Sequence, residues 1–196
     1  MSKIQANQIQ HTQNGAAVFT LPTSDGSANQ VLKSDGSGNL GFVAQTLAGI
    51  TEFDIWTMTG NHSADSGADL NNNLSRWNPS TANGAAAKIG TGMTKDTSTG
   101  VFTFPSTGLW VILSTVHMYL DGDDNAGVGI KVSEDGGTNF SYNSLVYQGQ
   151  ASGSSTAHSG TNIAYIDVTN TSNVKVKFSP NSLGTNSYIT GDSVYI

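Results

Sequence analysis

The residues best suited to chemistry lie in one acidic loop. In Asp121-Gly-Asp-Asp-Asn125, oxygen-bearing side chains alternate along the chain as the ligands of calcium loops do. Such a loop has glycine at its sixth position and a bidentate glutamate at its twelfth, whereas this chain has Ala126 and Val132 there. We interpret the loop as a solvated acidic turn and keep a Ca2+ site with ligands Asp121, Asp123 and Asn125 as the alternative.

One serine and the four histidines are the other candidates for catalytic or metal-binding residues. Gly191-Asp-Ser193 is similar to the Gly-Asp-Ser block of one hydrolase class, but no Asp-x-x-His follows to supply a base. The histidines, of which His117 is one, lack the spacing of metal ligands, and we interpret His117 as a packed or axis-facing side chain. We therefore expect no catalytic residue, no enzymatic activity and no cofactor apart from the Ca2+ alternative.

The composition narrows the class of protein. Only 11% of the 196 residues are charged, against about 25% in a typical soluble domain, and 23 are glycine. A net charge of −6, with Lys and Arg spread singly, argues against a nucleic-acid partner. No cysteine is present for disulfides, and no run approaches the roughly 18 apolar residues of a membrane helix. The N-terminal stretch lacks the apolar core of a signal peptide, so we expect synthesis in a cytoplasm without export by that route.

The elements that must position any site are strands. Gly100–Leu120 carries apolar residues at both alternating positions, which predicts a strand covered on both faces, with a second copy of the chain as one cover. Pro105-Ser-Thr-Gly108 predicts a turn that divides this stretch into a strand and a long strand.

The remaining pattern is also that of short strands. Further strands are predicted at Phe53–Met58, Val128–Val132, Phe140–Tyr147, Ile163–Val168, Val174–Phe178 and Tyr188–Ile196, with polar loops at Asn61–Asn83 and Gln148–Gly160. No segment has a sustained helical period. This predicts an all-β fold whose larger part, residues 53–196, is a jelly-roll β-sandwich.

An internal repeat marks the N-terminal region. Ser24-Asp-Gly-Ser-Ala-Asn29 recurs as Ser34-Asp-Gly-Ser-Gly-Asn39, and the second copy predicts a hairpin over Val31–Val43 that turns at Asp35-Gly36. Too few apolar residues surround it for a core. We expect an attachment or shaft segment at residues 1–45 and a hinge at residues 46–52.

The segment Leu21–Val43, LPTSDGSANQVLKSDGSGNLGFV, resembles the spacer near the N-terminal or shaft portions of bacteriophage tail-fibre and virion-appendage proteins. The alternative is a generic Gly/Ser linker that carries a hairpin. The resemblance implies a virion protein, made in the host cytoplasm, whose N-terminal segment binds other virion proteins. The attachment residues would be Ile4, Ile9, Val18, Phe19, Leu21, Val31, Leu32 and Phe42.

Gly100–Trp110, GVFTFPSTGLW, is similar to the G-x-F-T-x-P-x-x-G-x-Y signature of the trimeric jelly-roll superfamily of tumour necrosis factor and the complement subcomponent q head. Ser187–Ile196 is similar to the final strand of that family, with two residues inserted after Gly191. The resemblance implies a homotrimer without catalytic activity. The interface residues would be Phe102, Phe104, Leu109, Trp110, Val111, Ile112, His117, Tyr119 and Tyr195.

Three functions are consistent with the sequence. The first is a short trimeric tail fibre or appendage whose distal jelly roll binds a host-surface glycan or protein. The second is a capsid or head decoration protein of the same build with a stabilising role, and the third is a free carbohydrate-binding β-sandwich. A receptor site is expected at Trp77 with Asn72, Asn73 and Asn78, because glycans bind aromatic faces beside amides; Trp77 as a structural anchor of its loop is the alternative.

Overall fold

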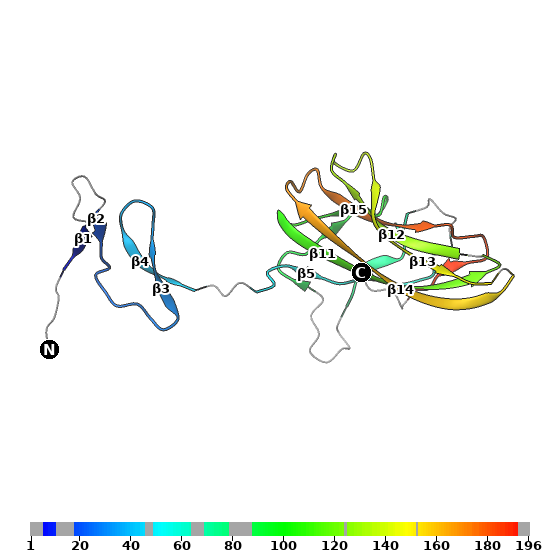
Figure 1. The fold of residues 1–196 in the computed structure, drawn as a ribbon, viewed down its shortest axis with the longest axis horizontal. Coiled ribbons are helices and arrows are strands. Elements are labelled where there is room, and N and C mark those ends of the chain that lie inside the picture. Colours follow the sequence, from blue (N-terminus) through cyan, green and yellow to red (C-terminus); the bar gives the residue numbers. More distant parts are fainter. Residues whose placement is uncertain are drawn as a thin grey trace. The chain divides into compact units, whose positions relative to one another are not determined.

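The computed structural model describes residues 6–10, 18–45, 49–63, 69–78, 88–123, 125–151 and 153–191. The chain divides into two compact units, Met1–Gly49 and Ile50–Ile196, and their boundary lies within the expected hinge at residues 46–52. Every regular element in the described ranges is a β-strand, which confirms the all-β prediction (Figure 1). Among these residues no helix is long and apolar enough to cross a membrane.

The N-terminal unit consists of two small antiparallel pairs. β1 (Gln8–Gln10) pairs with β2 (Val18–Thr20), and β3 (Gln30–Ser34) pairs with β4 (Leu40–Ala44). The β3–β4 hairpin turns where the sequence predicted: Gly36 has φ 79°, and the Asp35 carboxylate accepts hydrogen bonds from the backbone N–H groups of Ser37 and Asn39. Leu40 and Gly41 alone among these strand residues are partly buried.

The first layer of the second unit is a five-stranded antiparallel sheet with the order β13-β12-β15-β10-β9. Its strands are β9 (Thr94–Lys95), β10 (Phe102–Thr103), β12 (Asn125–Ser133), β13 (Ser141–Gly149) and β15 (Lys175–Asn181). The β12–β13 hairpin confirms the strands predicted at Val128–Val132 and Phe140–Tyr147. In the turn between them, the Ser133 hydroxyl and the Asp135 carboxylate accept hydrogen bonds from backbone N–H groups.

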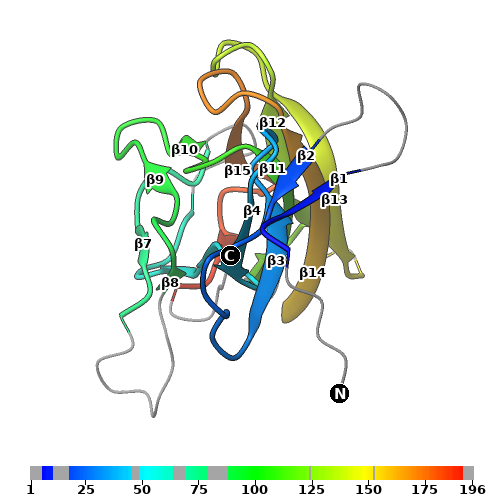
Figure 2. The same ribbon diagram turned by 90° about the vertical axis from the view of Figure 1, so that its left-hand side faces the viewer.

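The second layer is built on two long paired strands, β11 (Gly108–Asp121) and β14 (Ser155–Val168), seen side by side in Figure 1. β16 (Tyr188–Ile189) pairs with β11 at Met118 and Tyr119. Ile189 also forms an isolated β-bridge with His62, which follows β6 (Trp56–Met58) in the chain. β6 pairs with β7 (Leu74–Arg76), and β5 (Phe53–Asp54) pairs with β8 (Lys88–Ile89). β7 and β8 are labelled in Figure 2. Together the two layers form the predicted jelly-roll β-sandwich.

The core lies between the layers. Phe102 packs edge-on against Trp56 and Phe178, with ring centroids 5.0 and 5.7 Å apart. The strand–turn–strand prediction for Gly100–Leu120 is confirmed, because β10 and β11 flank the turn that begins at Pro105. The largest fully buried side chains are Phe102, Phe104, Phe178, Met58, Leu70, Met118, Leu120, Ile130, Ile189, Val116, Val128 and Val168.

Both predicted loops are wrong in part, since β7 (Leu74–Arg76) lies within Asn61–Asn83. Gln148–Gly160 was expected to be a loop, but β13 continues to Gly149 and β14 begins at Ser155. The polar residues of this half of β14 pair with β11 residue by residue, from Asp121↔Ser155 to Val116↔Gly160. The length of β11 therefore sets the length of β14, and side-chain polarity does not.

Candidate functional site

The candidate functional site is the outer face of the β11–β14 pair. On β11, Leu109, Val111 and Leu113 are 87%, 62% and 54% exposed. Opposite them on β14, Tyr165 and Ile163 are 74% and 45% exposed. Val111 faces Tyr165 and Leu113 faces Ile163 in the ladder, so these five side chains form one apolar patch on one side of the sheet.

The period of the two strands creates this face. Alternate residues of a strand point to opposite sides, and on β11 the other set is buried, from Ile112 through Val116 to Leu120. On β14, Ala164, Ile166 and Val168 are buried in the same way. Both strands are therefore apolar on two sides, but a single chain covers only the inner side. Contiguous exposed apolar patches of this kind mark interaction surfaces in soluble proteins.

The outer face becomes polar toward the end of β11. Thr115 and Thr161 hydroxyls lie 3.2 Å apart, and His117 Nδ1 lies 2.9 Å from Ser159 Oγ. Further along, Tyr119 stacks on Tyr188 of β16, with centroids 5.2 Å apart and ring planes at 25°. His117 and Tyr119, two of the predicted interface residues, thus share the outer face with Leu109 and Val111.

Several predicted interface residues lie elsewhere. Phe102, Phe104 and Ile112 are 1%, 1% and 8% exposed within a single chain, so their assignment to a subunit interface is wrong. They point into the sandwich because their register places them on the inner face. Trp110 is partly buried, and its ring packs on that of Phe104 with ring centroids 5.2 Å apart. Its indole N–H donates a hydrogen bond to the backbone oxygen of Ser106. Tyr195 lies outside the described residues.

Sequence reasoning missed three residues of the patch: Leu113, Ile163 and Tyr165. The signal was present in Ile163-Ala-Tyr-Ile-Asp-Val168, where apolar residues occupy both alternating positions as they do on β11. What the sequence could not give was the register that sets Ile163 and Tyr165 opposite Leu113 and Val111.

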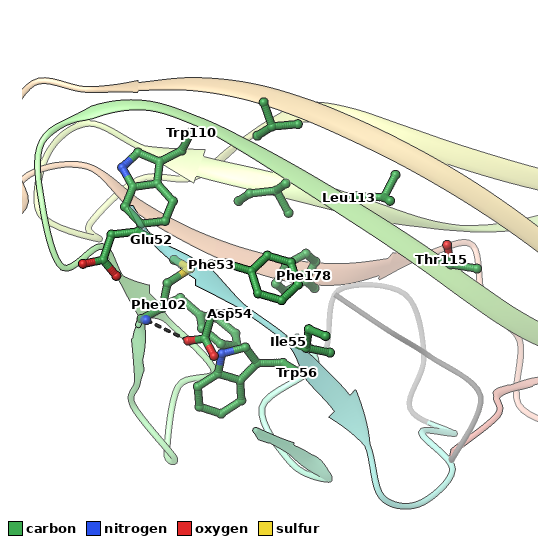
Figure 3. Close-up of a pocket in the computed structure, with 13 residues that line it drawn as sticks. Glu52, Phe53, Asp54, Ile55, Trp56, Phe102, Trp110, Leu113, Thr115 and Phe178 are labelled. Carbon is green, nitrogen blue, oxygen red and sulfur yellow. Dashed lines mark hydrogen bonds between the residues drawn. The ribbon is translucent and has the colours of Figure 1, made fainter. Parts of the chain in front are cut away.

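A cavity of about 370 Å3 lies between β11 and the segment that carries β5 and β6. Figure 3 shows Trp56, Phe102, Trp110 and Phe178 around it. At one end the Asp54 carboxylate is held by Arg76, with Nε–Oδ1 and Nη2–Oδ2 distances of 2.7 and 2.9 Å, and by the Met93 N–H at 2.8 Å. The hydrogen bonds to Asp54 raise the pKa of Arg76, so its guanidinium is charged at neutral pH.

The acidic loop is bonded to neighbouring segments. Asp123 Oδ2 accepts hydrogen bonds from the Gly184 N–H at 2.9 Å and from the Ser187 hydroxyl, and the Asp121 carboxylate accepts one from Ser155. In the described ranges no three His, Cys, Asp or Glu side chains gather as a metal site would require. The Ca2+ alternative for Asp121, Asp123 and Asn125 stays a prediction.

The predicted receptor residues lie on and beside β7. The Trp77 side chain is partly buried, and its backbone N–H donates to Ile55 O at 2.9 Å. Asn73 adopts φ 58°, and its side-chain amide donates to Asn61 O, so it has a structural role in the turn. Asn72 and Asn78 are exposed. This arrangement is consistent with either role considered for Trp77.

The predicted attachment residues are exposed within the N-terminal unit. Ile9 and Leu32 are 55% and 50% exposed, and Val18, Phe19, Val31 and Phe42 lie between 36% and 42%. Leu21 is partly buried, and Ile4 lies outside the described residues. The unit therefore presents apolar side chains that its own strands do not cover.

No model of a known protein family and no curated protein matches this sequence. Among solved structures, the chain is similar to the Eiger tumour necrosis factor of S. frugiperda, with 12% identity and a TM-score of 0.49. The similarity covers 73% of this chain and 88% of that chain. The strand order described above defines the second unit as a jelly-roll β-sandwich, and the comparison carries no conclusion about function.

Proposed function

We propose that the chain is a non-enzymatic structural protein of a virion, a short trimeric fibre or appendage. The observation that carries this proposal is the exposed apolar patch formed by Leu109, Val111, Leu113, Ile163 and Tyr165. A closed trimer, in which each copy uses part of this face against its neighbour, would remove these side chains from water. Such a contact supplies the second cover that two-sided apolar strands need.

The N-terminal unit is the part that attaches to the particle. Its strands leave Ile9, Leu32 and Phe42 exposed, and its hairpin sequence resembles the spacer of phage fibre proteins. Burial of these residues against other virion proteins stabilises both the contact and the unit itself.

The sandwich presents the host-binding surface, with a surface glycan or protein as its ligand. The neutral polar composition suits such a role, because Asn, Ser and Thr side chains hydrogen-bond to hydroxyl groups without strong charge. Trp77 with Asn72 and Asn78 is the proposed contact site.

Virus particles that contain the chain with an epitope at its N-terminus test whether the chain is part of the virion. Antibody labelling in electron micrographs should find the chain on the particle, and its absence from purified particles would refute a virion role. Trp77→Ala, compared with the wild type for host-cell adsorption and melting temperature, then tests the receptor site. Reduced adsorption at unchanged melting temperature supports it, whereas reduced melting temperature with normal adsorption makes Trp77 structural.

A further inference from the structure

The outer face of the five-stranded sheet carries aromatic side chains above glycines. In the ladder, Tyr147 on β13 faces Gly127 on β12, and Asn181 on β15 faces the same glycine from the other side. Val128 and Ile130, which alternate with the outer positions of β12, belong to the core. These three paired residues therefore lie on the side of the sheet that is turned away from the core.

The glycines of β12 make room for two tyrosine rings. A Cβ at Gly129 would clash with the ring of Tyr142. A Cβ at Gly127 would come within 3.0 Å of Cδ1 of Tyr147. The Tyr147 hydroxyl donates a hydrogen bond to Asn181 Oδ1, and Asn181 Nδ2 donates one to the Tyr142 hydroxyl at 3.1 Å. Because both hydroxyls reach from β13 to a residue of β15, each ring lies across the backbone of β12 between them.

Part of each ring stays open to water. Tyr142 and Tyr147 are 40% and 46% exposed, although their hydroxyls are bonded within the chain. Since Asn181 holds both hydroxyls, the rings keep their orientation without a ligand. An exposed aromatic ring that is already oriented offers contact area at a small cost in conformational entropy. We call Tyr142 and Tyr147 the tyrosine platform.

A lysine without a counter-ion borders the tyrosine platform. Lys131 faces Tyr142 in the ladder, and its Nζ lies 4.6 Å from the centroid of that ring. Lys177 faces Lys131 from β15, but its ammonium group is paired with Asp69 at 2.7 Å. Among the described residues Lys131 forms no ion pair. A carboxylate ligand at the platform would therefore meet an ammonium group that the chain itself does not neutralise.

A hollow beside Tyr142 adds polar groups to the site. It has a volume of about 470 Å3, and its lining includes Tyr142, Glu134, Asn139, Ser141 and Asn143. The side chains of Glu134, Ser141 and Asn143 are exposed. Carboxylate, hydroxyl and amide groups together offer hydrogen-bond acceptors and donors, which a ligand rich in hydroxyl groups needs.

We propose that the tyrosine platform binds an acidic saccharide. The C–H groups on one face of a sugar ring pack on the ring of Tyr147, because the face of an aromatic ring carries negative charge density. The carboxylate of the sugar binds the ammonium group of Lys131. Neighbouring hydroxyl groups of the saccharide bind Glu134 and Asn143 in the hollow. A ring contact beside an unpaired cation fits an acidic sugar better than a neutral one.

The platform is separate from the surfaces described above. It belongs to the five-stranded sheet, whereas the apolar patch belongs to the sheet of β11 and β14. It also shares no residue with the site proposed at Trp77. Binding of an acidic saccharide therefore requires neither the trimer nor a place in a virion, and either proposal can fail while the other holds.

Isothermal titration calorimetry of the full-length chain tests the proposal with two acidic probes, tetragalacturonate and sialyllactose. Their neutral counterparts are the carboxyl-reduced tetrasaccharide and lactose. At least one acidic probe should bind, and its neutral counterpart should bind at least about tenfold more weakly. Lys131→Met should abolish this preference. Lys33→Met, which removes an exposed lysine of the N-terminal unit, is the matched control and should keep it.

Tyr147→Ala should weaken binding of the acidic probe by about tenfold, whereas Tyr147→Phe, which keeps the ring, should lose less. Circular dichroism shows whether each variant is folded, and if Tyr147→Ala is not, Lys131→Met decides alone. The proposal is overturned if neither acidic probe binds, if acidic and neutral probes bind equally, or if a folded Lys131→Met protein keeps the preference. A lower molar mass for Tyr147→Ala than for the wild type would assign this face to a contact between copies and would also overturn it.

Discussion

The two units of this chain use the same turn but differ in what lies on either side of it. In the N-terminal hairpin, Asp35 accepts hydrogen bonds from the backbone and side-chain N–H groups of Asn39 at 3.1 and 2.6 Å. In the sandwich, Asp135 accepts the same two bonds from Asn139 at 2.9 and 2.6 Å. The first turn joins largely exposed strands, and the second joins β12, which is mostly buried, to β13.

This difference shows what each level of structure contributes. The aspartate and asparagine fix the turn and thereby the register of a hairpin, whichever unit they occupy. They do not provide a core. A core forms only in the sandwich, because its two sheets cover each other and bury apolar surface. We therefore expect most of the free energy of unfolding to come from the sandwich.

The largest expected loss of stability follows the removal of an aromatic side chain from the core. Phe178→Ala should destabilise the sandwich by about 3–5 kcal/mol, because Phe178 is 2% exposed and packs on Phe102. Phe42→Ala in the N-terminal unit is the matched control and should cost far less, since Phe42 is 38% exposed. Urea denaturation of both variants measures the difference. Equal losses of unfolding free energy in the two variants would contradict the claim that the stability of the chain resides in the sandwich.

The next effect concerns the ion pair that ties β5 to β7. Arg76→Met leaves the Asp54 carboxylate, whose side chain is 4% exposed, without its cation. Because Arg76 itself is 32% exposed, we expect a loss of about 2 kcal/mol, below that for a fully buried pair. The double variant Asp54→Asn/Arg76→Met should recover part of this loss. No recovery would mean that the packing of Arg76 over Trp56, rather than its charge, is what matters.

A smaller effect should appear with pH. Hydrogen bonds from Asn139 and Ser133 lower the pKa of Asp135, and those from Asn39 and Ser37 lower the pKa of Asp35. A carboxylate with a lowered folded-state pKa stabilises the fold above its unfolded pKa of about 3.9, and this contribution is lost as the pH falls through the folded value. The melting temperature of the sandwich should therefore fall in acid, and less so in Asp135→Asn. Asp35→Asn should leave that melting curve unchanged; an equal response to both variants would show that the units unfold together.

Local chemistry made much of the fold predictable. Asp35-Gly36 identified the N-terminal hairpin because turn geometry depends on a few adjacent residues. The patterns of Val128–Val132 and Phe140–Tyr147 identified the two strands of the β12–β13 hairpin. The long strand β11 was predicted from its apolar residues alone. The first half of β14 was not, because its Ser, Thr and Gly residues are held in a strand by their pairing with β11, which is distant in sequence.

The candidate site was predictable only in part. Alternation showed that β11 has two apolar faces, of which the one with Leu109 and Val111 is exposed within a single chain. It could not show which face the second sheet covers, so Phe102, Phe104 and Ile112 were assigned to the wrong side. Tyr165 and the Tyr119–Tyr188 stack depend on pairings between distant strands, which no local pattern specifies.

The molar mass in solution tests the central claim, that the outer face of β11 and β14 is a contact between copies of this chain. Light scattering coupled to size exclusion, at micromolar concentration, should give three times the chain mass for the wild type. Val111→Asp should give a folded monomer with an unchanged circular dichroism spectrum, because Val111 is 62% exposed within one chain and the charge acts only on the contact. Ile89→Asp, at a 45% exposed apolar residue outside this face, should remain trimeric. A folded wild-type monomer, or a Val111→Asp protein that stays trimeric, would contradict the account.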